Sequence, residues 1–306
     1  MQRRTLLKLG LGAWALPGFA SDTRPDKVID AAVHFYDPAR PQGVPWPGAN
    51  STLLYKRTYP DRYLAAIKPF TVDGVIAIEA SPWLEDNLWL LNVADQNPLI
   101  RAVVGNIQPG HPDFSAALDR FSKHPLFRGI RIGAGLLPRV LAQPELLQDL
   151  KRLSDKDLHL DILVNSPSFA QIAELAARLP DLRIVVGHLP LDSPKDAAGR
   201  AQFVEGLRSC ARHLRVFAKV SGVVRRTGDG VPADAAWYKP QLDELWDFFG
   251  PDRVIYASNW PASDLIAEYP VVYRVVLDYV SNRGKEETEK FFWKNSRSAY
   301  KWKDNA

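Results

Sequence analysis

Short runs of apolar and β-branched residues recur along the chain from about residue 28 onward, and stretches with a helical period separate them. Runs such as Val75-Ile76-Ala77-Ile78 and Arg183-Ile184-Val185-Val186 are continuous rather than alternating. Continuous runs are typical of strands that are buried on both faces. The predicted strands cover residues 28–35, 74–80, 100–107, 128–132, 158–164, 182–187, 215–221 and 253–258.

The segments between these strands repeat apolar residues every three or four positions, as Ile172, Leu175 and Leu179 do. The predicted helices cover residues 61–70, 84–96, 112–122, 144–156, 168–179, 201–213, 235–249 and 269–282. Eight strand–helix alternations with connections of ordinary length predict an α/β fold of the (β/α)8 barrel type. A doubly wound sheet is the alternative, but no Gly-x-Gly-x-x-Gly turn follows an early strand.

The first 22 residues follow a different pattern. Arg3-Arg4 precedes two leucines and Lys8, an apolar stretch covers residues 9–16, and small residues end at Ala20. This order predicts a twin-arginine export signal over residues 1–22, with cleavage after Ala20, and a single barrel domain over residues 23–306. The apolar stretch is shorter than the roughly 20 residues that span a bilayer. We therefore expect a periplasmic or extracellular protein without a stable membrane anchor.

Charge and composition narrow the possible partners. The chain has 39 Lys and Arg against 35 Asp and Glu, and removing Arg3, Arg4 and Lys8 with the signal leaves 36, or a net charge of about +1. No basic cluster remains that would neutralise a run of phosphates, so we expect no nucleic-acid partner. The single Cys210 excludes an internal disulfide. The pattern predicts a small-molecule substrate and leaves the oligomeric state open.

Polar residues stand at the carboxyl ends of seven predicted strands. In a (β/α)8 barrel these ends meet at one face, where side chains reach a substrate. Two long irregular stretches, 38–60 and 222–232, follow the first and seventh strands, and we expect them to border the same face. The polar residues are His34, Glu79, Arg131, Asn165, His188, Lys219 and Asn259.

Several of these residues lie in segments with a familiar order. The opening segment Ile29-Asp30-Ala31-Ala32-Val33-His34-Phe35 resembles that of the amidohydrolase superfamily, in the branch that includes sugar-lactone and dicarboxylate-lactone hydrolases. Residues 127–131, 186–189, 218–222 and 258–261 are similar to later landmarks of that branch, in order and at similar spacing up to Trp302. The resemblance implies a barrel that hydrolyses a lactone or related ester.

The resemblance also implies a metal site, of which this chain has lost several ligands. The family pattern has His-x-His after the first strand, one His each after the fifth and sixth, and Asp after the eighth. The matching residues here are Ala32 and His34, then Asn165, His188 and Asn259. Two imidazoles and two amides make a poor site for a divalent ion. We expect no cofactor, and weak binding of a divalent metal at His34 and His188 is the alternative.

Loss of the metal leaves the general base to be identified. Some relatives open lactones without metal, using the Asp of the eighth strand as base, but the amide of Asn259 cannot titrate near neutral pH. Glu79 is the first candidate for the base, Asp264 the second, and His34 or His188 the third. The alternatives are that Glu79 is a buried acid paired with Lys219 or Arg131, and that both histidines are core residues.

Arg131 and Lys219 are candidate substrate-binding residues. Two cations that face one cavity suit an anionic substrate or the oxyanion that forms when an ester carbonyl is attacked. The alternative is an ion pair with Glu79 or Asp30 at the barrel mouth.

Asparagines and tryptophans at the same face suit a different part of a substrate. Asn165 and Asn259 both donate and accept hydrogen bonds, as sugar hydroxyls require. Trp83 and Trp260, together with Trp46, are predicted platforms for sugar or aromatic rings, and packing of the barrel rim is their alternative role.

Three functions are consistent with these residues. The first is an exported, metal-independent hydrolase of a lactone or related ester of a sugar or small carboxylic acid. The second is a lyase or decarboxylase that holds a small carboxylate with Arg131 and Lys219. The third is a catalytically silent periplasmic barrel that binds a sugar or an aromatic acid.

Overall fold

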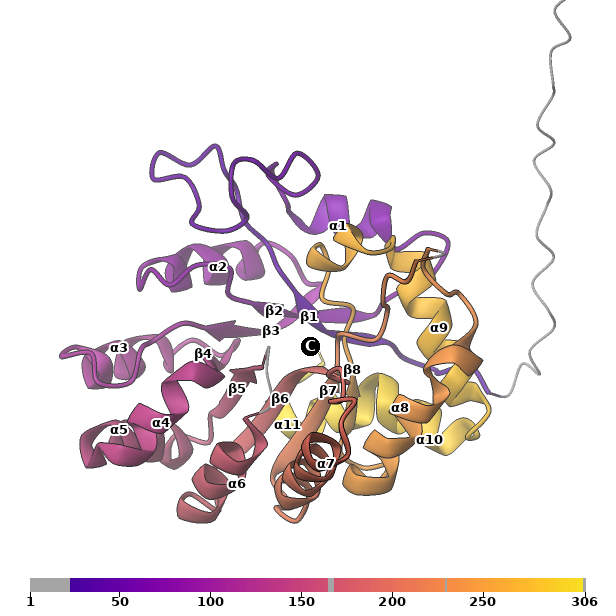
Figure 1. Cartoon of the computed structure of the whole chain (residues 1–306). Helices are drawn as coiled ribbons and strands as arrows, with labels where there is room; N and C mark the ends of the chain where they lie inside the picture. The colour runs from indigo at the N-terminus through magenta and orange to yellow at the C-terminus, as the bar shows by residue number, and fades with distance from the viewer. Residues whose placement is uncertain (1–22, 165–167, 229, 305–306) are drawn as a thin grey trace, which may run out of the picture.

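The computed structural model describes residues 23–164, 168–228 and 230–304. Eight parallel strands pair with their neighbours in chain order, and helices surround them (Figure 1), which confirms the predicted barrel. The strands are β1 (Ile29–Val33), β2 (Gly74–Ile78), β3 (Ile100–Gly105), β4 (Phe127–Gly133), β5 (His159–Leu163), β6 (Arg183–Leu189), β7 (Val216–Val220) and β8 (Val254–Tyr256).

Helices follow the strands and pack on the outside of the barrel. They are α1 (Pro60–Ala66), α2 (Asp86–Asp95), α3 (Phe114–Phe121), α4 (Leu137–Ala142), α5 (Pro144–Asp155), α6 (Phe169–Arg178), α7 (Ala197–Ala211), α8 (Ala235–Phe249), α9 (Tyr269–Ser281), α10 (Lys285–Glu289) and α11 (Asn295–Tyr300). Short helical turns add η1 (Ala134–Leu136), η2 (Ala262–Leu265) and η3 (Lys290–Lys294). The periodicity located a helix after each strand but did not predict α4, α10 or α11. No helix in the described ranges has both the length and the apolar character needed to cross a membrane.

The barrel closes between its first and last strands. The backbone N–H of His34 donates to the carbonyl of Trp260 at 2.9 Å, and Val33 forms a parallel bridge with the same residue. This contact brings the residues after β1 and β8 together at the mouth.

Two apolar cores hold the barrel. One lies between the strands and the outer helices, and the other fills the interior, where Ile76, Val104 and Val185 point inward. Tyr300 and Trp302, from near the end of the chain, belong to the inner core. The C-terminal segment therefore closes the barrel from below, whereas the cavity opens at the other end.

Candidate active site

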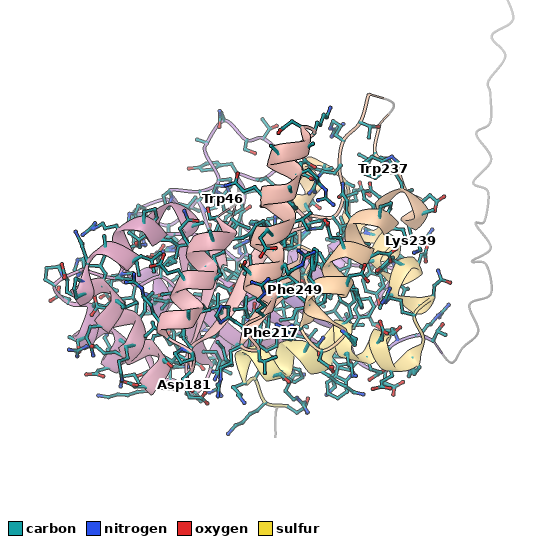
Figure 2. All side chains as sticks on the ribbon, turned by 60° about the horizontal axis from the view of Figure 1, so that its bottom comes forward. Trp46, Asp181, Phe217, Trp237, Lys239 and Phe249 are labelled. Atoms are coloured by element: carbon teal, nitrogen blue, oxygen red, sulfur yellow. The ribbon has the colours of Figure 1, made fainter. Side chains whose placement is uncertain are left out.

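A cavity of about 540 Å³ lies at the carboxyl ends of the strands. Figure 2 shows Trp46 at this end of the barrel and Asp181, which precedes β6, at the other end. A cavity of this size fits a small molecule. Five of the predicted site residues line it: His34, Glu79, Arg131, His188 and Asn259.

Beneath this cavity lies a hollow of about 10 Å³, enough for about one water molecule. His34, Arg131, His188 and Asn259 border both spaces, so the hollow is the floor of the cavity. Ala32, Asp161 and Lys219 line the floor only. The strand positions that the family pattern assigns to ligands therefore converge here, except Asn165, which lies outside the described residues.

His34 is buried, and its ring is held through Nδ1. Its Nδ1 lies 3.0 Å from the carbonyl oxygen of Ile78 and 3.1 Å from that of Glu79, so Nδ1 carries the proton and donates. Its Nε2 then carries no proton and faces the side-chain amide of Asn259, with 3.3 Å to Oδ1. Burial and the nearby charge of Arg131 lower the pKa of His34 to about 3, so the ring is neutral at physiological pH.

His188 and Asn259 share an uncommon backbone conformation at the ends of β6 and β8. Their φ values are 62° and 60°, in the left-handed region that side chains rarely adopt, and such residues cluster at functional sites. The backbone N–H of His188 lies 2.8 Å from Oγ of Ser221, and a Cβ on Gly222 would stand 3.0 Å from the His188 carbonyl oxygen. Burial and the charge of Lys219 lower the pKa of His188 to about 4.

Glu79 and Arg131 form an ion pair in the cavity wall. Nε of Arg131 donates to Oε1 of Glu79 at 2.8 Å, and one terminal nitrogen donates to the Glu79 carbonyl at 2.8 Å. Their side chains are 13% and 16% exposed, so the pair reaches the cavity. Among the described residues, none is bonded to Oε2 of Glu79 or to the other terminal nitrogen of Arg131. Within the described part of the chain, one atom of each partner is therefore left to meet a substrate.

Lys219 pairs with Asp161, neither with Glu79 nor with Asp30, which corrects the predicted partners of Lys219, whereas the predicted alternative of a Glu79–Arg131 pair is observed. Its ammonium also donates to the hydroxyl of Tyr300 at 3.0 Å, and the Asp161 and Lys219 side chains are 2% and 5% exposed. Burial disfavours the Asp161 carboxylate, but Lys219 outweighs it and lowers the pKa of Asp161 to about 2. Lys219 therefore forms part of the floor as one half of a neutral pair.

Two further acids lie outside the cavity lining. Asp30 is buried, accepts from the Ser258 N–H at 2.8 Å and the Tyr63 hydroxyl at 3.0 Å, and joins β1 to β8 and α1. Asp264 lies in η2, and burial raises its pKa to about 6 against the opposing charge of Arg62. The cavity lining includes Ala262 from this turn but not Asp264, so its place does not favour the role of general base.

Of the three tryptophans, Trp46 lines the cavity. Its ring meets His34 edge-on at 5.5 Å. Trp83 is 38% exposed and lies outside the lining, so its ring is not a wall of the cavity. Trp260 is wholly buried and packs on Tyr63 at 5.3 Å. The prediction of a substrate platform is thus wrong for Trp260, which packs the barrel rim.

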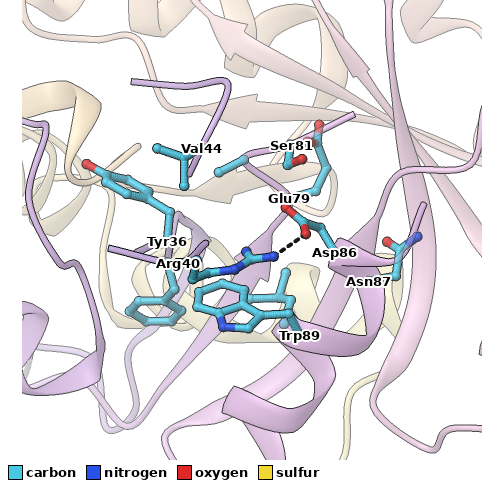
Figure 3. A pocket seen from close by; sticks show the side chains of 11 residues that line it. Tyr36, Arg40, Val44, Glu79, Ser81, Asp86, Asn87 and Trp89 are labelled. Carbon is cyan, nitrogen blue, oxygen red and sulfur yellow. Dashed lines mark hydrogen bonds and ion pairs between the residues drawn. The ribbon is translucent and has the colours of Figure 1, made fainter. Parts of the chain in front are cut away.

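The loop that carries Trp46 is fastened to α2. The guanidinium of Arg40 pairs with Asp86 and lies over the ring of Trp89, 4.7 Å from its centroid, as Figure 3 shows. Both partners of the ion pair are only 12% exposed. This clasp holds the β1–α1 loop against the wall formed by Glu79 and Ser81.

Three polar residues of the site were not predicted from the sequence. Ser81 and Asn106 line the cavity just after β2 and β3, and Asp161 lines the floor from β5. A signal was present, because Asp161 interrupts an apolar run and Asn106 follows one. Their partners come from distant segments, so the sequence did not distinguish them from ordinary loop or buried polar residues.

The described residues do not fit a tightly bound divalent metal. Zinc takes three or four ligands from Cys, His and carboxylates, and no three such side chains in the described ranges are placed to share an ion. The floor offers His34, His188 and Asp161, but Asp161 is paired with Lys219, and the cationic Arg131 lies beside the histidines. We therefore derive no step through a metal.

Known proteins resemble this chain over most of its length. A family model described as Amidohydrolase matches residues 29–302. An L-fucono-1,5-lactonase of Burkholderia ambifaria is 29% identical over 79% of this chain and 82% of its own length, and one of Burkholderia multivorans is 25% identical over 87% and 92%. The crystal structure of an amidohydrolase from B. multivorans with bound zinc superposes with a TM-score of 0.80 and 24% identity, over 90% of this chain and all of that one.

Proposed function

The chain belongs to the amidohydrolase family and is a hydrolase, and from that premise we propose that it opens a lactone ring in the cavity at the barrel mouth. The observation that carries the proposal is the Glu79–Arg131 pair, which offers an acceptor and a donor to one cavity. The two relatives named as L-fucono-1,5-lactonases support a lactone as the substrate.

The charges of the cavity favour a neutral, hydroxylated lactone over a dicarboxylate. Arg131 is the cation among the described lining residues, and Glu79 neutralises it. Lys219 lies in the floor and is neutralised by Asp161. A substrate with two carboxylates would leave water without new cationic partners, which is costly. Ser81, Asn106 and Asn259 offer hydrogen bonds that suit hydroxyl groups.

Glu79 is the proposed general base. It takes a proton from water through Oε2 while the water oxygen attacks the lactone carbonyl, and Arg131 holds the oxyanion with its free terminal nitrogen. As Glu79 takes the proton it loses its negative charge, while the lactone carbonyl oxygen gains one. The guanidinium of Arg131 therefore has an anion beside it throughout the step. The tetrahedral intermediate breaks its bond to the ring oxygen, which leaves as an alcohol with the proton from Glu79. The product is a hydroxy acid.

His188 is a weaker base for the same step. Burial and the positive charges of Lys219 and Arg131 disfavour a protonated His188 and lower its pKa. As a neutral ring it serves as a hydrogen-bonding wall of the cavity. His34 donates from Nδ1 to the end of β2 and is a positioning residue for that segment.

We propose that this chemistry needs no metal, because Glu79 and Arg131 supply the base and the electrophile. Dialysis against a chelator should leave the lactonase rate unchanged. Stoichiometric zinc or manganese in the purified protein, with loss of activity on its removal, would contradict this part of the proposal.

The test is proton release from a panel of sugar lactones, with Glu79→Gln as the variant. Gln keeps the size of the side chain and cannot accept the proton, so turnover should fall by about 10²–10⁴-fold. Glu85→Gln is the matched control, because Glu85 also pairs with an arginine, Arg120 at 2.7 Å, but on the exposed surface. Turnover retained by Glu79→Gln would make His188 the base. A wild-type protein that opens no lactone but releases carbon dioxide from a small carboxylate would replace the proposal by the decarboxylase alternative.

We also propose that residues 1–22 export the folded enzyme to the periplasm or beyond. These residues lie outside the described ranges, and the proposal is supported by the Arg3-Arg4 pattern alone. Fused to a reporter, residues 1–22 should direct export, and changing both arginines to lysine should stop it, because a point charge does not mimic a guanidinium. Export that survives the double change would disprove a twin-arginine route.

A further inference from the structure

The ends of β2 and β3 carry two polar side chains that the hydrolytic step does not use. Ser81 and Asn106 are 8% and 7% exposed, and both line the large cavity. The Glu79 N–H donates to the Val104 carbonyl at 2.8 Å, so the two strands stay paired up to the proposed base. Ser81 and Asn106 therefore follow Glu79 on one polar edge of the cavity.

Asn106 is held so that its side chain keeps a free donor. Its Oδ1 accepts from the Gln108 amide at 3.0 Å, whereas its Nδ2 has no partner among the described residues. The Ser81 hydroxyl oxygen accepts from the Trp83 N–H at 3.1 Å, and no described residue accepts its proton. Two donors, Ser81 and Asn106, thus face the cavity. Among the described lining residues at the ends of these two strands, Glu79 is the other polar one.

Asn87 of α2 holds the backbone of Asn106 in place. Asn87 is 2% exposed, its Oδ1 accepts from the Asn106 N–H at 2.8 Å, and its Nδ2 donates to the Asn106 carbonyl at 2.8 Å. A Cβ on Gly105 would stand 2.2 Å from Oδ1 of Asn87, so this position must be glycine for the amide to approach. The side-chain amide of Asn87 thus bonds the backbone of Asn106 as a neighbouring strand would.

We propose that Ser81 and Asn106 form a subsite that recognises a ring hydroxyl of the lactone, and that Asn87 positions it. The inference rests on the proposed function and names the part of the substrate that these residues contact. A site built to hydrogen-bond a hydroxyl discriminates strongly against an analogue without it, because its polar groups are then left unpaired. Selectivity for hydroxylated over plain lactones should therefore depend on these residues.

The experiment compares D-glucono-1,5-lactone, which carries ring hydroxyls, with δ-valerolactone, the same ring without them. The quantity measured is the kcat/KM for D-glucono-1,5-lactone divided by that for δ-valerolactone. In the full chain, Asn106→Ala should lower this ratio by about tenfold, the effect of one lost hydrogen bond. Ser81→Ala should act in the same direction. Gly105→Ala, which displaces Asn87, should lower the same ratio even though neither Gly105 nor Asn87 lines the cavity.

A control separates positioning from stability. Asn295 is another buried asparagine that bonds backbone groups, donating to the Pro251 and Val254 carbonyls at 2.8 Å, far from the cavity. Asn295→Ala should lower the melting temperature and leave the ratio unchanged. A wild-type enzyme that opens both lactones with no change of ratio in Asn106→Ala overturns the subsite alone. Failure of the wild type on every lactone overturns the proposed function first.

Discussion

Replacing Asp161 by Asn leaves the buried charge of Lys219 under the cavity without its partner. The change keeps the shape of the side chain but removes the charge that faces Lys219, whose side chain is 5% exposed. Removing one partner of a buried pair costs about 3–5 kcal/mol, because the other charge is left without compensation. At this chain length about 2 °C in Tm corresponds to 1 kcal/mol, so we expect Tm to fall by about 6–10 °C at pH 7.

The pH dependence distinguishes an uncompensated charge from a simple packing defect. In the variant the buried Lys219 resists protonation, whereas an unfolded lysine keeps its proton up to about pH 10.4. The unfolded state then binds more protons, so stability rises with pH and the penalty shrinks between pH 7 and 10. The assay is urea unfolding followed by circular dichroism at several pH values. Asp155→Asn is the control, because its pair with Lys151 is about half exposed and should contribute at most about 1 kcal/mol. Equal losses in both variants, or a penalty independent of pH, would refute the reasoning.

Three further changes have defined outcomes. Stability should fall as pH drops from about 6.5 toward 4, because burial holds the pKa of His34 near 3 and of His188 near 4 while the unfolded imidazoles take up protons. Asp30, whose pKa burial raises to about 6, offsets part of this loss. Urea midpoints at pH 7 and pH 5, compared between His188→Asn and the exposed control His111→Asn, measure the effect. Restoring the family ligands with Ala32→His, Asn165→His and Asn259→Asp should produce a zinc site measurable by titration. Single changes should not produce this site, and adding His188→Asn to the triple variant should weaken it. A folded triple variant without affinity for zinc would show that the ligand positions do not converge. Arg40→Met, which opens the clasp to Asp86, should raise KM for the lactone more than it lowers kcat, because the Trp46 loop loses its attachment, and a change in kcat alone would contradict that role.

The architecture and the position of the site were readable from the sequence because both depend on local properties of the chain. Continuous apolar runs mark strands buried on both faces, and eight of them alternating with helical periods are compatible with few folds. In a parallel barrel every strand ends at the same face, so His34, Glu79, Arg131, His188 and Asn259 were expected together, and they line one cavity. The resemblance to the amidohydrolase family and the expectation of a hydrolase are likewise confirmed.

The partners of these residues were decided only by the tertiary structure. Lys219 meets Asp161 rather than Glu79 because both point into the barrel interior, where Tyr300 arrives from the end of the chain. Trp260 is buried because the closing contact between β1 and β8 turns its ring onto Tyr63. The spacing of buried positions and the ends of the strands depend on a few neighbouring residues. The partners of an ion pair and the direction of a loop side chain depend instead on strand register and barrel closure. Those are set by contacts between segments tens to hundreds of residues apart, which no local pattern records.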